Sequence, residues 1–118
     1  MPVGEIDRAF RLFRRKRFPD VIRLLESQIF RFRENPEFYF LLGVSCLYTG
    51  DYGGGESYLK RADQLKPQDV QILLGLAAVA FKRGQIEEAL RIWLRVLDLE
   101  PRNRQAHRGL NILRRSSI

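Results

Sequence analysis

Apolar residues recur along this chain at helical spacing, interrupted by short polar or glycine-containing stretches. From residue 36 onward, Tyr39, Leu42 and Cys46 fall on one face of a predicted helix that stops at Gly50. The next stretch shows the same spacing and stops before a proline, a residue that favours helix ends. No alternation with a period of two occurs, so the pattern predicts an all-α fold without strands.

The hydrophobic pattern repeats along the chain. We define one repeat period as the number of residues from Gly50 to Gly84, which is about 34. Pro67 and Pro101 are separated by the same interval. The period predicts three units, each of two helices, and a shorter final segment. We expect about seven helices in a single domain, 1–118, with units at about 2–35, 36–69 and 70–103 and a capping helix at 104–116.

A repeat of two helices with this period, about 34 residues, resembles the tetratricopeptide repeat. The first unit is looser than the others, and its second helix is expected to continue through FRFRE, residues 30–34. The resemblance implies antiparallel helix pairs stacked into a right-handed superhelix, an α-solenoid, closed by the capping helix. The second and third units carry the family pattern at Tyr39, Leu42-Gly43, Gly55, Leu59 and Pro67, and at Leu73, Leu76-Ala77, Ala89, Trp93 and Pro101.

The run of three glycines, 53–55, is not a phosphate-binding loop. It matches neither GxxxxGK[ST] nor GxGxxG, and no strand precedes it. Gly55 falls where the repeat needs a small residue between paired helices, while the pattern gives no reason for Gly53 and Gly54. The single histidine, His107, and single cysteine, Cys46, supply no metal-ligand set and no nucleophile–base pair. We therefore expect no enzyme activity, no metal and no cofactor.

Composition narrows the class of protein further. The chain has 118 residues, of which 45% are hydrophobic and 30% charged, so a packed core is expected. One cysteine excludes a disulfide framework and favours a reducing compartment, so we expect a cytoplasmic location. The apolar stretches are shorter than the roughly 20 residues of a membrane span. The chain could be a fragment of a longer protein.

The net charge of +7 is concentrated at the two ends of the chain. Residues 1–35 carry nine basic and five acidic residues, and residues 104–118 carry four basic and none acidic. This excess favours anionic partners in general. Arginines at positions 8, 11, 14 and 15 have helical spacing, which we interpret first as a solvated helix face.

The resemblance also implies a concave groove, lined by the first helix of each unit, in which a partner lies. The matching positions are unusually apolar, and large exposed apolar surfaces mark interaction sites. The candidate partner-binding residues are Ile6, Phe10, Phe13, Arg14, Phe40, Val44, Leu47, Tyr48, Leu74, Ala78, Phe81, Lys82 and Arg108.

The leading hypothesis is a scaffold or chaperone-like adaptor that holds an apolar or amphipathic protein segment, with some acidic character, in this groove. A groove suited to such a segment is similar to that of the small tetratricopeptide chaperones of bacterial secretion systems. The family's carboxylate clamp, which grips acidic chaperone tails, has no counterpart here, because its positions hold Ile6, Phe10, Leu41, Gln71 and Gly75.

Two alternatives remain open. The groove could bury a second copy of the chain, making the protein a self-associating assembly component. The arginine-rich ends could instead bind RNA or a membrane. Nucleic acid and membrane are the least favoured partners, because the basic ends lack the interleaved aromatic residues of single-strand readers.

Overall fold

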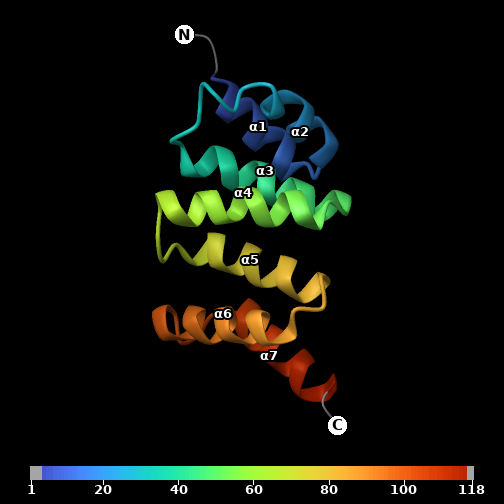
Figure 1. Ribbon diagram of the computed structural model, residues 1–118, viewed down its shortest axis with the longest axis vertical. Helices are drawn as coiled ribbons and strands as arrows, with labels where there is room; N and C mark the ends of the chain where they lie inside the picture. Colours follow the sequence, from blue (N-terminus) through green and yellow to red (C-terminus); the bar gives the residue numbers. More distant parts are fainter. Residues whose placement is uncertain (1–3, 117–118) are drawn as a thin grey trace. The chain divides into compact units, whose positions relative to one another are not determined.

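A computed structural model describes residues 4–116 of the chain (Figure 1). The described residues contain helices and turns but no strand, which confirms the predicted all-α fold. Among the described residues, no helix is long and apolar enough to cross a membrane. The helices are α1 (Glu5–Arg14), α2 (Phe18–Glu26), α3 (Pro36–Thr49), α4 (Tyr52–Leu65), α5 (Val70–Lys82), α6 (Ile86–Leu99) and α7 (Arg104–Ser116).

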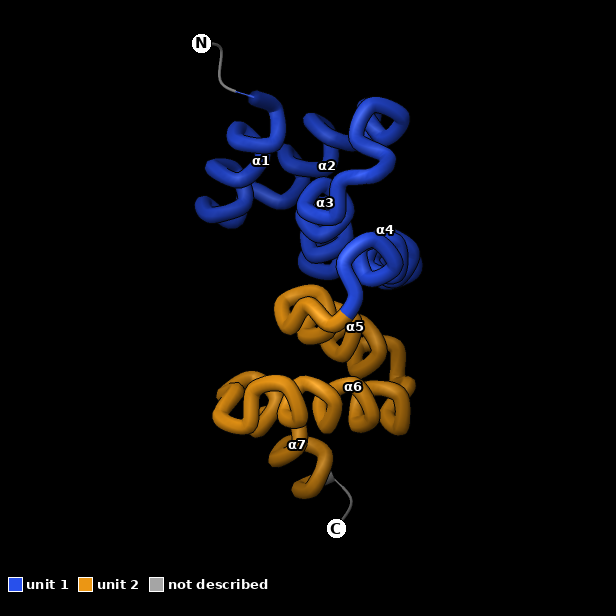
Figure 2. Tube along the Cα trace, turned by 90° about the vertical axis from the view of Figure 1, so that its left-hand side faces the viewer, with its two compact units in different colours: residues 1–67 blue, residues 68–118 orange. Residues whose placement is uncertain are grey.

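The helices group into two compact units (Figure 2). The first, residues 1–67, holds α1 to α4, and the second, residues 68–118, holds α5 to α7. We call these the first unit and the second unit, and we call the helix pairs of the sequence pattern repeats. The pairs α1–α2, α3–α4 and α5–α6 coincide with the three units expected from the repeat period. The grouping of all three repeats into one domain stays a prediction.

The same tight turn joins the two helices of each pair. In the α3–α4 turn the N–H of Asp51 donates to the carbonyl of Cys46 at 2.9 Å, and the N–H of Gly50 donates to that of Leu47 at 3.2 Å. Gly50 has a φ of 91°, as this Schellman motif requires, so the predicted glycine stop is confirmed. Equivalent bonds run from Arg17 and Lys16 to Leu12 and Phe13, and from Gln85 and Gly84 to Ala80 and Phe81.

Helix starts repeat with the same period. Asn35, Asp69 and Asn103 are each separated by one repeat period, and they directly precede α3, α5 and α7. Each side chain accepts a hydrogen bond from a backbone N–H in the first turn, which satisfies a donor that would otherwise lack a partner. The donors are Phe38 at 3.2 Å, Ile72 at 3.0 Å and Ala106 at 2.9 Å.

Helix α2 ends at Glu26, so the prediction that it continues through FRFRE is wrong. Residues 27–34 form turns instead. The ring of Phe32 stacks on the fully buried ring of Phe38 in α3, with 5.3 Å between centroids. Burying an aromatic ring contributes more than the few tenths of a kcal/mol per residue that helix propensity supplies, so this packing overrides the local helical pattern.

The glycines of the second repeat, residues 36–69, have two different roles. A Cβ on Gly43 would lie 2.5 Å from Cγ of Leu59 and 3.2 Å from the carbonyl oxygen of Gly55, so the small residues let α3 and α4 touch. Gly54 has a role that the sequence pattern did not reveal. A Cβ there would collide with the carboxylate of Asp51, which caps α4 by accepting the N–H of Gly54 at 2.9 Å.

The second compact unit has a core of alanines and aliphatic residues around Trp93. Helix α7 packs on α6 at Gly109, where a Cβ would collide with the Trp93 indole ring. Helix α7 thus covers the apolar side of α6, as a capping helix does. The buried members of this core are Leu73, Leu74, Ala77, Ala80, Ala89, Trp93, Val96 and Ala106.

Candidate functional site: an aromatic row in the first unit

Four aromatic side chains from three helices form a continuous row in the first unit. Phe13 of α1 lies 6.1 Å from Phe40 of α3, measured between ring centroids. Phe13 also meets the edge of Phe18, at the start of α2, at 5.5 Å. Phe18 in turn stacks on Tyr48, near the end of α3, at 4.6 Å and 15° between ring planes. We call Phe40, Phe13, Phe18 and Tyr48 the aromatic row.

The row is packed on itself and is also accessible. Tyr48 is 66% exposed despite its stacked partner, and the other three rings are partly exposed. Offset and edge-on contacts of this kind hold the rings in fixed orientations. The aromatic row is therefore an accessible apolar surface made of rings in contact with one another.

Positive charge borders the row. Arg14 follows Phe13 directly in α1 and is exposed, and Lys16 and Arg17 lie in the turn before Phe18. Arg17 is paired with Asp20 at 2.7 Å. Arg14 and Lys16 make no ion pair with any other described residue. The border of the row thus favours acidic over basic side chains in a partner.

The remaining predicted residues of the first unit differ in accessibility. Ile6, Phe10 and Leu47 are partly buried, whereas Val44 is only 8% exposed and packs in the interior. Phe18 was absent from the predicted site. The sequence signal that could have indicated it is its offset of one repeat period from Tyr52, another aromatic residue.

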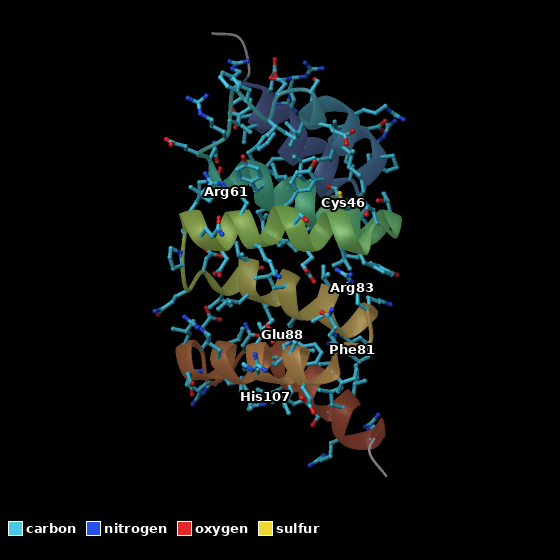
Figure 3. The ribbon with its side chains drawn as sticks, viewed as in Figure 1. Cys46, Arg61, Phe81, Arg83, Glu88 and His107 are labelled. Carbon is cyan, nitrogen blue, oxygen red and sulfur yellow. The ribbon has the colours of Figure 1, made fainter. Side chains whose placement is uncertain are left out.

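The second unit holds the other predicted groove residues. Phe81 is partly buried and lies 5.9 Å from the Trp93 ring, so it belongs to the edge of the core (Figure 3). Leu74 is only 7% exposed. Ala78 is partly buried, and both Lys82 of α5 and Arg108 of α7 are exposed. This unit therefore offers cations and little accessible apolar surface at the predicted positions, and their assignment to a groove stays a prediction.

The candidate reactive groups are inert or isolated. Burial raises the pKa of the Cys46 thiol to about 11, so the thiol keeps its proton at neutral pH and is a poor nucleophile. A ring nitrogen of the exposed His107, in α7, lies 2.8 Å from the carbonyl oxygen of Pro101 in the turn before that helix. Among the described residues, no group of three or more His, Cys, Asp and Glu is placed to hold a metal ion.

Repeated helix pairs, repeated turns and an ordered aromatic face define this chain as an α-helical repeat protein. Its sequence matches two tetratricopeptide repeat profiles, one over residues 6–70 and the other over residues 47–111. Each match spans more than half of the chain, so the protein belongs to the tetratricopeptide repeat family. A comparison with curated protein sequences finds no match.

Solved structures of tetratricopeptide domains share the fold. The second such domain of human RPAP3, in complex with the HSP70 peptide SGPTIEEVD, has a TM-score of 0.84 and 22% identity, covering 93% of this chain and 92% of that one. The Arabidopsis OM64 domain has a TM-score of 0.87 and 17% identity, covering 94% and 92%. The Yersinia enterocolitica type III secretion chaperone SycD, with a peptide of the translocator YopD, has a TM-score of 0.83 and 12% identity, covering 97% and 92%.

Proposed function

We propose that this chain is a non-catalytic, cytoplasmic protein-interaction module, and that the aromatic row holds an apolar or amphipathic segment of a partner. The observation that carries the proposal is Tyr48, whose ring stacks on Phe18 and is nevertheless 66% exposed. Covering an exposed ring of this size contributes about 25 cal/mol per Å² of apolar surface removed from water. Rigid aromatic side chains are also typical anchors of interfaces.

The charges around the row extend the proposal to the partner's chemistry. Arg14 and Lys16 border the row without acidic partners among the described residues. A partner segment with apolar residues on one side and carboxylates at its edge would complement both features. Binding of peptides by related folds, the HSP70 peptide by RPAP3 and the YopD peptide by SycD, supports a peptide-like ligand here.

An acidic chaperone tail does not fit the proposal. Three of the five positions that would supply a carboxylate clamp hold the apolar residues Ile6, Phe10 and Leu41, and the other two hold Gln71 and Gly75, so no position carries a cationic side chain. Of these five residues only Gln71 has a side chain that can donate a hydrogen bond, and one neutral amide does not replace the lysine and arginine of a clamp. We therefore expect the peptide SGPTIEEVD, which accompanies the RPAP3 domain, not to bind this chain.

A displayed peptide library tests the proposal directly. Peptides of about four helical turns, ~15 residues, would be selected on the purified protein and their affinities measured by fluorescence anisotropy. We expect selected peptides to carry spaced apolar residues with Asp or Glu, and Tyr48→Ala to weaken them about tenfold. Leu94→Ala is the matched control, because Leu94 is a 50% exposed apolar residue of the second unit.

Two results would overturn this function. Either no peptide is enriched over the library background, or the selected peptides bind Tyr48→Ala and the wild type equally well. The alternative of self-association has its own readout in sedimentation equilibrium. A wild-type dimer that becomes monomeric in Tyr48→Ala would show that a second copy of the chain, and not another protein, covers the aromatic row.

A further inference from the structure

A second group of side chains in the first unit, none of them a member of the aromatic row, combines arginines with an exposed aromatic ring. Phe30, in the turns between α2 and α3, is 80% exposed, more than any other large hydrophobic residue of the described chain. The guanidinium of Arg33 lies over its ring, 4.5 Å from the centroid. Arg31 lies in the same way over Phe32, at 5.0 Å. Arginine and phenylalanine therefore alternate along this segment.

The segment is held in place by its neighbours. Phe32 is anchored against the buried Phe38. The carbonyl oxygen of Arg33 accepts hydrogen bonds from the Tyr39 hydroxyl at 3.1 Å and from the guanidinium of Arg61 at 3.4 Å. The exposed ring of Phe30 is thus carried by a fixed backbone. Little conformational entropy remains to be lost when a ligand covers it.

A row of arginines on α1 continues from this segment. Arg31 is paired with Glu5 at 3.5 Å, which places the segment beside the start of α1 (Figure 1). Arg8 and Arg11 of α1 and Arg15, its C-cap residue, follow Glu5 at three- and four-residue intervals, so they lie along one side of the helix, and all three are exposed. None of the three makes an ion pair or hydrogen bond through its side chain with another described residue.

We propose that this surface binds single-stranded nucleic acid. Bases stack on exposed aromatic rings and on guanidinium planes, and arginines neutralise the phosphates that follow along the strand. From Arg8 to Arg15 the row extends over about 10 Å at a rise of 1.5 Å per residue, which is the length of about three phosphates at 3.4 Å each. We define the Phe30 patch as Phe30, Arg31, Arg33, Arg8, Arg11 and Arg15.

The arrangement favours nucleic acid over the other anionic partners. A membrane surface would need several apolar side chains to insert, and within the described first unit the exposed large hydrophobics are Phe30 and the distinct Tyr48. An acidic polypeptide would pair with the arginines, but its carboxylates are repelled by the negative face of the Phe30 ring. Single-strand readers interleave aromatic and basic residues, and the sequence alone led us to expect none at the basic ends. The turns after α2 do supply this interleaving, with Arg31 over Phe32 and Arg33 over Phe30.

Fluorescence anisotropy with labelled oligouridylate and oligothymidylate of about 15 nucleotides tests the proposal. We expect binding that weakens with salt, with a slope of log K against log salt near −3, because Arg8, Arg11, Arg15 and Arg33 together would neutralise about four phosphates at 0.7 each. Phe30→Ala should weaken binding about tenfold at an unchanged slope, whereas Phe30→Trp should retain it. The triple variant Arg8→Gln, Arg11→Gln, Arg15→Gln should reduce the slope by about 2.

The control is a triple variant of equal charge in the second unit: Arg104→Gln, Arg108→Gln, Arg115→Gln, all exposed in α7. Equal loss of affinity in the two triple variants would overturn the proposal, because net charge alone would then explain binding. Absence of binding at about 50 mM salt, or an unaffected Phe30→Ala, would also overturn it. Polyglutamate or phosphatidylserine vesicles that bind more tightly than the oligonucleotides would assign the patch to an acidic protein or a membrane instead. Unchanged helical circular dichroism establishes that each variant is folded.

Discussion

Lys16 and Gly50 occupy the same position of two successive helix-to-helix turns, one repeat period apart, and both have a positive φ, 60° and 91°. Glycine adopts this conformation without a steric penalty, whereas for a residue with a Cβ it costs roughly 1 kcal/mol or more. The first repeat therefore contains a strained turn that the second and third repeats, with Gly50 and Gly84, avoid.

Replacing this lysine should relieve the strain. We expect Lys16→Gly to raise the free energy of unfolding by about 0.5–1 kcal/mol, since the relief exceeds the extra entropy of glycine in the unfolded chain. Urea denaturation followed by circular dichroism measures the change. Arg15→Gly, at a neighbouring position with a φ of −85°, should show no such gain. A destabilised Lys16→Gly would contradict the strain argument.

The adjacent glycines at the start of α4 form a matched pair. Gly53 has no atom near an added Cβ, so Gly53→Ala should stabilise the protein by about 0.5–1 kcal/mol through helix propensity. Gly54→Ala makes the same gain but displaces the Asp51 carboxylate from its capping position, at a cost of about 1 kcal/mol. Thermal unfolding should therefore rank Gly53→Ala above Gly54→Ala. Equal melting temperatures would show that the cap adapts to the methyl group.

Ser45 buries a hydroxyl that has no hydrogen-bond partner among the described residues. Such a group costs about 1–3 kcal/mol of desolvation that nothing returns. Ser45→Ala should therefore raise the free energy of unfolding by about 1 kcal/mol in urea titrations. Ser57→Ala, at an exposed helical position, measures the part due to helix propensity. Destabilisation by Ser45→Ala would indicate that the hydroxyl has a partner, such as a buried water.

Cys46 should react only when the protein opens. The thiol is 3% exposed and its pKa is raised to about 11 by burial, so Ellman's reagent at pH 8 should label it at a rate that increases with urea. A Cys46→Ala, Ser57→Cys variant, with its thiol exposed, should react at once.

The raised pKa of Cys46 also implies that stability from the protonated thiol is present below about pH 9 and is lost as pH rises toward 11. Cys46→Ala should lack this component of the alkaline loss of stability.

The sequence predicted those parts of the fold that local chemistry determines. Helix ends at Gly50 and Gly84 follow from backbone freedom and were visible as a repeat. The regular spacing of Asn35, Asp69 and Asn103 is a local signal of the same kind, because these residues mark three helix starts.

Features that depend on packing between helices could not be predicted in the same way. The end of α2 at Glu26 follows from the contact of Phe32 with Phe38, a partner in the next helix. Phe18 joins the aromatic row only because α1 and α3 bring Phe13 and Tyr48 to either side of it. Helical periodicity gives the face on which a residue lies, but it does not give the depth to which a neighbouring helix covers that face.

The periodic caps and turns have a consequence for how such a chain can evolve. Successive segments of one repeat period begin after an equivalent capping side chain, and in the three repeats the paired helices are joined by an equivalent turn. An in-frame duplication or deletion of one such segment would leave every start and stop signal intact, whatever lies on the helix faces. Gene recombination could therefore lengthen or shorten the protein one repeat at a time, while the exposed residues of each copy diverge toward new partners.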